Sequence, residues 1–196
     1  MAAPGERKFQ ILQTLAAMLE TPGGEKITTA ALAGRLNVSE AALYRHFASK
    51  AQMFEGLIEF IEQSVFSLIN KITSSQQNGL DQCEAIVSLL LGFAQKNPGM
   101  TRVLIGDALI NENDRLQARI NQLHDRLEAT LRQCLRMGAA DGDIRTDIDS
   151  IATANLLLCH VIGRWHQFAK SGFKRLPAEA FAQQWALLSV EFTVKR

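Results

Sequence analysis

The chain has 196 residues, of which 47% are hydrophobic, with a formal net charge of +1 and a mean hydropathy of -0.01. These values predict a globular protein with a substantial core and exclude a globally basic one, so any nucleic-acid surface must be local. We expect no signal peptide and no membrane span, because no apolar run has the required length, and three scattered cysteines suit a reducing compartment. We therefore expect a cytoplasmic protein.

The spacing of apolar residues predicts an all-α chain of about nine helices. The segment 138–147 is rich in Gly and Asp and is expected to be a mobile loop. The helices are expected at about 7–21, at two short segments within 27–47, and at about 50–72, 80–96, 100–109, 113–137, 148–171 and 178–194.

Residues 27–50, ITTAALAGRLNVSEAALYRHFASK, predict two short helices joined by a tight turn. Thr28 or Thr29 can cap the first helix, because a hydroxyl oxygen accepts a hydrogen bond from an unpaired amide. Asn37 falls where the chain must reverse, and Asn tolerates the left-handed conformation. Ser39 is suited to cap the second helix. This pattern predicts a helix-turn-helix.

The second helix of this motif has a polar outer face suited to a DNA groove. Leu43 and Phe47 lie four residues apart and are expected to point inward, which leaves the three residues between them outside. Ser49 and Gln52 match a capping box, so a third helix is expected to begin at Lys50. The alternative is an ordinary pair of surface helices, because this geometry also occurs without DNA. Four cations in or beside the motif can bind phosphate: Lys26, Arg35, Arg45 and Lys50.

The motif T-x-x-x-L-A followed by V-S-x-x-x-L-Y-x-H-F-x-S-K is typical of the TetR family, and residues 9–55 resemble its DNA-binding domain. The resemblance implies a TetR-type fold, with a three-helix DNA-binding domain at 1–50 and a larger effector-binding and dimerisation domain at 51–196. It also implies a homodimer that binds palindromic double-stranded DNA. The expected DNA contacts are Thr28, Thr29, Ser39, Ala41, Ala42, Tyr44, Arg45, His46 and Lys50; the two small alanines allow close approach to the groove.

The last two helices carry more apolar faces than a monomer needs to cover. Two such helices from each chain can form a four-helix bundle across a two-fold axis, which is the dimer interface of the TetR family. The alternative is that these side chains only complete the monomer core. The expected interface residues are Leu156, Ile162, Trp165, Phe168, Trp185, Leu188 and Phe192.

Some residues lie away from the apolar stripes of the two helices at 50–72 and 80–96. At about 100° per residue, Phe60 falls well off the stripe centred on Phe54, beside Met53. On the following helix a leucine, a glycine and a lysine share one face, which can form a shallow groove for an extended acidic peptide. The alternative is that the glycine permits tight helix packing. These three residues are Leu89, Gly92 and Lys96.

Residues 39–64 and 89–123 also resemble one branch of the TetR family, the nucleoid occlusion factors. The resemblance implies nucleoid association and binding of the C-terminal tail of FtsZ, a tubulin-like division GTPase, which blocks Z-ring assembly over the nucleoid. The positions implied for the tail are Phe60, Leu89, Gly92, Lys96 and Asn97.

The alternative function is a TetR-type repressor released from DNA by a small hydrophobic ligand. The expected core faces of the 50–72 and 80–96 helices are nearly all Leu, Ile, Val and Phe, which favours a filled core. No cofactor, metal site or catalytic constellation is expected. Cys159, His160 and His166 do not place three ligands on one helix face, and no phosphate loop or nucleophile elbow occurs. We therefore do not expect an enzyme.

Overall fold

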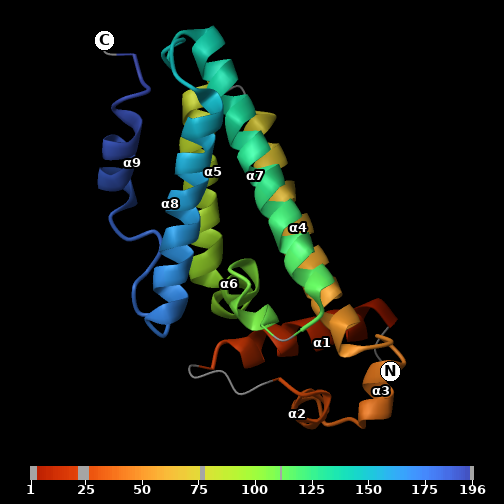
Figure 1. Cartoon of the computed structure of the whole chain (residues 1–196). Helices are drawn as coiled ribbons and strands as arrows, with labels where there is room; N and C mark the ends of the chain where they lie inside the picture. Colours follow the sequence, from red (N-terminus) through yellow and green to blue (C-terminus); the bar gives the residue numbers. More distant parts are fainter. Residues whose placement is uncertain (1–3, 22–26, 76–77, 111, 195–196) are drawn as a thin grey trace. The chain divides into compact units, whose positions relative to one another are not determined.

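The computed structural model describes residues 4–21, 27–75, 78–110 and 112–194, so the expected cation Lys26 lies outside the described residues. Within these ranges the fold is all-α, as expected, and none of the described helices has the length and apolarity needed to cross a membrane. The elements, labelled in Figure 1, are α1 Pro4–Leu19, α2 Thr29–Arg35, α3 Glu40–Tyr44, α4 Lys50–Thr73, α5 Gly79–Lys96, α6 Pro98–Leu104, the 3-10 helix η1 Asp107–Leu109, α7 Asp114–Asp141, α8 Ser150–Lys170 and α9 Phe181–Ser189.

The chain forms two compact units. The first unit contains the described residues within 1–62 and 97–120, and the second contains those within 63–96 and 121–196. Both α4 and α7 contribute residues to each unit. The boundary between residues 50 and 51 stays a prediction.

In the first unit, α6 packs against the backbone of α1. A Cβ atom placed on Gly99 would lie 1.9 Å from the carbonyl oxygen of Ala16, so only glycine permits this approach. Arg102 then ties α6 to the end of α1, because its Nη1 donates to the Leu19 carbonyl at 3.3 Å. Its Nε donates to the Asp107 carboxylate at 2.7 Å. These contacts fix α1, α6 and η1 together.

In the second unit, α5 packs against both α7 and α8. The Trp165 side chain is fully buried, and its indole N–H donates to the Leu90 carbonyl at 3.1 Å. At the other end of α5, a Cβ atom on Gly79 would lie 2.1 Å from the Cys134 carbonyl oxygen. The core around these contacts is aliphatic: Ile86, Val87, Leu91, Leu127, Leu131, Leu157 and Val161.

The expectation of a loop over 138–147 is wrong for its first residues, since α7 continues to Asp141. Gly138 lies inside α7, where a larger residue would clash with the Ile144 side chain: a Cβ atom there would be 2.6 Å from Ile144. Ile144 is 1% exposed and forms an isolated antiparallel bridge with Thr193. The glycine therefore serves close packing rather than a loop.

The helix expected over 100–109 is divided in two. α6 ends at Leu104, and η1 follows after Gly106, whose φ of 77° lies in the left-handed region. That conformation interrupts a right-handed helix, and glycine adopts it at little cost.

Candidate functional site

The helix-turn-helix forms as its local sequence predicts. Of the two threonines that could cap α2, Thr28 does so, because its Oγ1 accepts from the Ala31 amide at 3.1 Å. Asn37 makes the turn with a left-handed φ of 52°. Ser39 caps α3, since its Oγ accepts from the Ala42 amide at 3.3 Å.

The start of α4 shows a shifted capping box. Ser49 Oγ accepts from the Gln52 amide at 3.2 Å, as expected. The Gln52 side chain returns to the amide of Ala48, at 2.8 Å, one residue before the cap. The two ends of the box still satisfy two backbone donors, so Lys50 is fixed as the first residue of α4.

The outer face of α3 is oriented as the spacing predicts. Leu43 and Phe47 are buried, whereas Tyr44 is 45% exposed and Arg45 is also exposed. Because these side chains are exposed, they are accessible to a DNA phosphate. The other expected DNA contacts divide into exposed residues (Thr28, Ser39, Ala41) and half-buried ones (Thr29, Ala42, His46, Lys50).

Two of these residues belong to a hydrogen-bond network that ends at a carboxylate. Thr29 Oγ1 donates to Glu40 at 2.5 Å and lies within 3.5 Å of the Tyr44 hydroxyl, which donates to it. This network connects α2 with α3 and orients both hydroxyls. Glu40 therefore orients hydroxyl groups on the outer face of α2 and α3. Its place in the first turn of α3 predicts only a favourable interaction with the helix dipole.

Lys50 has a partner that spacing along the chain does not reveal. Its ammonium group forms an ion pair with Glu112, which lies in the connection between η1 and α7. The same ammonium lies 5.7 Å from the centroid of the Phe54 ring. Glu112 was missed because 62 residues separate it from Lys50.

The residues implied for the FtsZ tail lie in both units and are described within each. In the first unit, Phe60 is half-buried, and its ring packs on that of Phe9 with centroids 5.6 Å apart. Met53, which the helical wheel places on the same side, is fully buried, so that part of the prediction is wrong. The reason is that neighbouring helices bury Met53, and a helical wheel takes no account of neighbouring helices.

Asn97, also in the first unit, immediately precedes α6, and its carbonyl accepts from the Thr101 hydroxyl at 3.0 Å.

In the second unit, Leu89 and Gly92 are half-buried and Lys96 is exposed at the end of α5. A Cβ atom on Gly92 would meet no heavy atom of the described residues within 4 Å. Tight helix packing therefore does not explain this glycine within the described part of the chain. A glycine inside a helix lowers stability by roughly 0.5–1 kcal/mol relative to alanine, and no packing contact of the described residues offsets this cost at Gly92.

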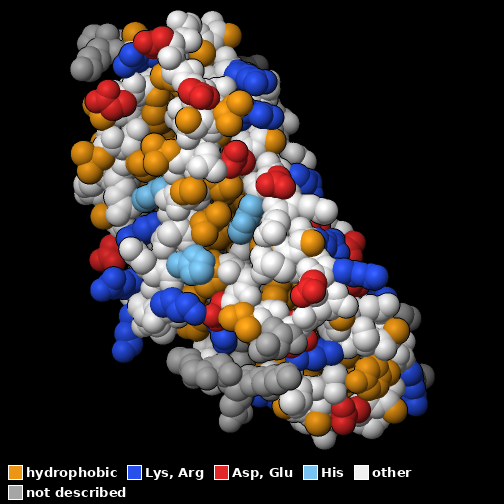
Figure 2. Space-filling view, viewed as in Figure 1, with side chains coloured by type: hydrophobic (Ala, Val, Ile, Leu, Met, Phe, Trp, Pro, Cys, Tyr) orange, Lys and Arg blue, Asp and Glu red, His pale blue; other side chains and the backbone are white. Residues whose placement is uncertain are grey.

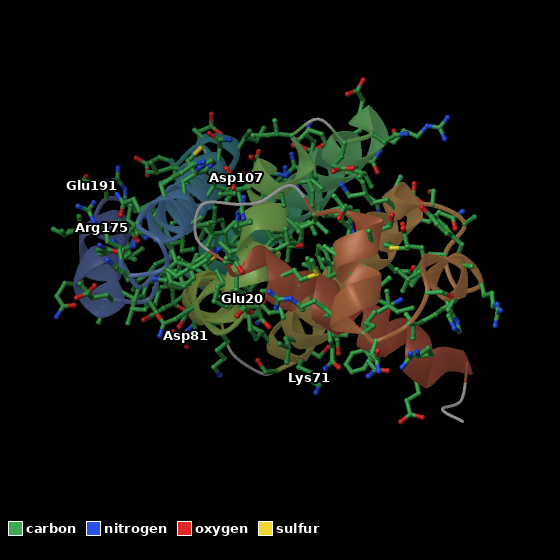
Figure 3. The ribbon with its side chains drawn as sticks, turned by 90° about the horizontal axis from the view of Figure 1, so that it is seen from below. Glu20, Lys71, Asp81, Asp107, Arg175 and Glu191 are labelled. Carbon is green, nitrogen blue, oxygen red and sulfur yellow. The ribbon has the colours of Figure 1, made fainter. Side chains whose placement is uncertain are left out.

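Another part of α5 borders a hollow of about 430 Å³. Its lining includes two carboxylates, those of Asp81, labelled in Figure 3, and Glu84. It also includes Ala85, Ser88 and Phe181. The carboxylates disfavour an acidic peptide here. The face that carries Leu89 and Lys96 is better suited to one.

The residues expected at a dimer interface differ in how far they are buried within the single chain. Trp165, Phe168, Trp185 and Phe192 are buried within the chain, whereas Leu156 is 53% exposed. Ile162 and Leu188 are half-buried. Other apolar side chains of this region are exposed, and Figure 2 shows hydrophobic side chains at the surface over α8 and α9. These are Ile151, Leu187 and Val190, at 54%, 75% and 46% exposure.

The cysteines differ in environment. Cys83 and Cys134 are buried, and the hydrogen bond between their two side chains, together with burial, raises the pKa of the Cys83 thiol far above its ordinary value. Cys159 is exposed on α8. Among the described residues, no group of three or more His, Cys, Asp and Glu side chains is arranged to hold a metal ion.

Comparison with known proteins identifies the family. Residues 11–57 match the model for bacterial regulatory proteins of the tetR family. Residues 77–193, more than half of the chain, match the tetracyclin repressor-like C-terminal domain. The chain belongs to the TetR family. It is therefore a DNA-binding regulator, and the expected fold and the resemblance to this family are confirmed.

The curated relatives match nearly the whole chain. A protein of Alteromonas mediterranea is 53% identical over 186 residues, which cover 95% of each chain. A protein of Idiomarina loihiensis is 53% identical over 182 residues, covering 93% of each. A protein of Shewanella oneidensis is 50% identical and covers 93% of this chain and 92% of its own. All three are named nucleoid occlusion factor SlmA, and these relatives are DNA-binding regulators of the TetR family rather than enzymes.

Solved structures of more distant proteins share the fold. A ketosteroid transcriptional regulator of Mycobacterium tuberculosis has a TM-score of 0.77 at 19% identity, covering 96% of each chain. The regulator FadR of Bacillus subtilis, in complex with stearoyl-CoA, has a TM-score of 0.76 at 14% identity, covering 93% of this chain and 97% of its own. At these identities the likeness shows the fold alone.

Proposed function

We propose that this chain is a nucleoid occlusion factor of the cytoplasm, associated with the nucleoid. As a homodimer it binds palindromic chromosomal sites and the C-terminal tail of FtsZ, and it thereby blocks Z-ring assembly over the nucleoid. One observation carries this proposal: identity of 53% to a nucleoid occlusion factor extends over 95% of the chain. It therefore includes the second unit, whereas the solved TetR-fold regulators described above are under 20% identical.

The proposed DNA surface is the outer face of α2, α3 and the start of α4. Two copies of α3 must reach successive major grooves about one helical turn apart, which accounts for palindromic sites. Hydroxyls and cations of this face contact phosphates, and the small residues of α3 allow close approach to bases. The proposed contacts remain Thr28, Thr29, Ser39, Ala41, Ala42, Tyr44, Arg45, His46 and Lys50.

The proposed dimer surface is the exposed apolar face of α8 and α9. Burial of large apolar side chains drives association, and those available on this face include Leu156 and Leu187. Gly163, on α8, is exposed, and no described atom lies within 4 Å of the position of a Cβ there, which leaves room for a second helix. The buried Trp165, Phe168, Trp185 and Phe192 support this face from within the chain, and the half-buried Ile162 and Leu188 complete it.

The reactivity of Cys159 tests this surface. At about 100° per residue, Cys159 falls close to Leu156 and Gly163 on α8, so dimerisation should cover its thiol. We expect Ellman's reagent to modify Cys159 at least about tenfold more slowly in the dimer than in a monomeric Leu187→Glu variant. The buried Cys83 and Cys134 should react only on unfolding, which provides an internal control. Equal rates for Cys159 in the two proteins would contradict the proposed surface.

The proposed FtsZ-tail surface combines apolar side chains with a cation. On the second unit, the Lys96 ammonium and Leu89 complement an acidic, partly apolar peptide, and on the first unit Phe60 is the proposed apolar contact. The open position beside Gly92 allows a peptide backbone to approach α5. Asn97 supplies an adjacent polar group.

The substitution Gly92→Ala tests this function most sharply. Because no described atom crowds that position, alanine should raise the free energy of unfolding by about 0.5–1 kcal/mol. The same methyl group should weaken binding of the FtsZ tail by about tenfold, equivalent to about 1.4 kcal/mol. The measurements are thermal unfolding and the fluorescence anisotropy of a labelled tail peptide, with and without palindromic DNA.

Gly34→Ala provides the matched control, because Gly34 also lies in a helix with no described atom within 4 Å of a Cβ. It should leave tail binding unchanged. A wild-type protein that binds no tail peptide in either condition would overturn the FtsZ proposal. The ligand-released repressor would then be the better hypothesis.

A further inference from the structure

The ion pair between Lys50 and Glu112 is set into the first unit rather than free on its surface. The two side chains are 23% and 14% exposed, so water screens the pair less than it screens an exposed one. The Phe54 ring, 5.7 Å from the ammonium, adds a cation–π contact. Lys50 is thus held toward Glu112 in the protein without DNA.

Glu112 is held by the backbone on both sides. Its own amide donates at 3.0 Å to the carbonyl of Leu109, the last residue of η1. The next residue, Asn113, accepts from the Arg115 amide at 3.0 Å and caps the start of α7. The carboxylate therefore has a defined position close to Lys50.

A DNA phosphate and Glu112 are both anions that bind the same ammonium group. A phosphate can engage Lys50 fully only by displacing this carboxylate, and the carboxylate also repels an approaching phosphate. That displacement needs a phosphate held at a fixed position. Base contacts of α3 provide such a register only on a cognate site, because on other sequences the protein shifts along the duplex.

We propose that Glu112 determines specificity by competing with DNA phosphates for Lys50. The inference rests on the proposed phosphate contact of Lys50. On non-cognate DNA the ion pair persists and Lys50 adds little affinity. On a cognate site the phosphate held by the fixed register replaces Glu112. Glu112 thereby weakens non-cognate binding more than cognate binding.

The test is the substitution Glu112→Gln, which removes the charge and keeps the shape. Anisotropy would compare a palindromic duplex selected by this protein from a random pool with a scrambled duplex of equal length, over a series of salt concentrations. On the scrambled duplex we expect several-fold tighter binding and a slope of log K against log salt that is steeper by about 0.9, the contribution of one added phosphate contact. On the cognate duplex we expect a smaller gain and an unchanged slope.

Two further variants make the result specific. Glu191→Gln has the same effect on net charge, and Glu191 lies beside α9 in the second unit (Figure 3), so this variant should behave as wild type on both duplexes. In a Lys50→Met background, Glu112→Gln should no longer favour the scrambled duplex over the cognate one, because only the general repulsion between the carboxylate and phosphates is then removed. Thermal unfolding of each variant verifies that it is folded.

Three outcomes would overturn the inference. The first is Glu112→Gln acting no more strongly than Glu191→Gln. The second is an effect of Glu112→Gln on the ratio of the two affinities that survives in the Lys50→Met background, since Glu112 would then not act through Lys50. The third is wild-type affinity of Lys50→Met for the cognate duplex. That result would remove the phosphate contact itself, while the other proposed DNA contacts and FtsZ binding would be unaffected.

Discussion

Replacement of Gly99 by alanine should lower the free energy of unfolding by at least about 3 kcal/mol, a large stability effect for a single methyl group. The added Cβ would lie 1.9 Å from the Ala16 carbonyl oxygen and 2.9 Å from its carbonyl carbon. Both are backbone atoms of α1, so they cannot move aside as a flexible side chain can. Relief requires α6 to separate from α1, which also disturbs the hydrogen bond from Arg102 to Leu19.

The measurement is thermal unfolding by circular dichroism. For a chain of this size, a loss of about 3 kcal/mol corresponds to a fall in Tm of roughly 6–12 °C. Gly5→Ala is the matched control on α1, because no described atom lies within 4 Å of a Cβ at Gly5. A Tm of Gly99→Ala within about one degree of the wild type would show that α6 does not approach α1 as described.

The substitution Leu187→Glu should abolish dimerisation and with it high-affinity binding to palindromic DNA. Leu187 is 75% exposed in the single chain and is the most exposed large apolar residue among those described. A carboxylate there meets no steric conflict in the monomer, but it would have to be desolvated in an apolar interface. In a monomer, binding of one DNA-binding domain to its half-site no longer holds a second domain close to the other half-site. Affinity for the palindrome should fall by about 10²–10⁴-fold.

Sedimentation and anisotropy on the same samples test this prediction. The variant should sediment as a monomer that retains the wild-type Tm at low protein concentration and binds a half-site as weakly as the wild type does. Glu179→Gln, an exposed change before α9, should remain a dimer. A Leu187→Glu protein that stays dimeric would exclude this face as the interface.

The helix-turn-helix illustrates what the sequence by itself determined. The caps of Thr28 and Ser39 and the left-handed turn at Asn37 each depend on groups within about four residues along the chain, which is the range of helical hydrogen bonds. The inward direction of Leu43 and Phe47 follows from helical periodicity for the same reason. The motif and the outer face of α3 could therefore be predicted without a fold.

The tertiary structure alone decided which apolar and charged groups meet. Periodicity does not distinguish Trp185, which is buried, from Leu187, which is exposed, because burial depends on helices distant in sequence. The same is true of the residues of 138–147, which were expected to be mobile although Ile144 is buried against Gly138. Glu112 reaches Lys50 across 62 residues, and no local rule predicts that contact. Interactions within one helical turn are contained in the local sequence, whereas packing, burial and ion pairing between segments arise only once the helices are assembled.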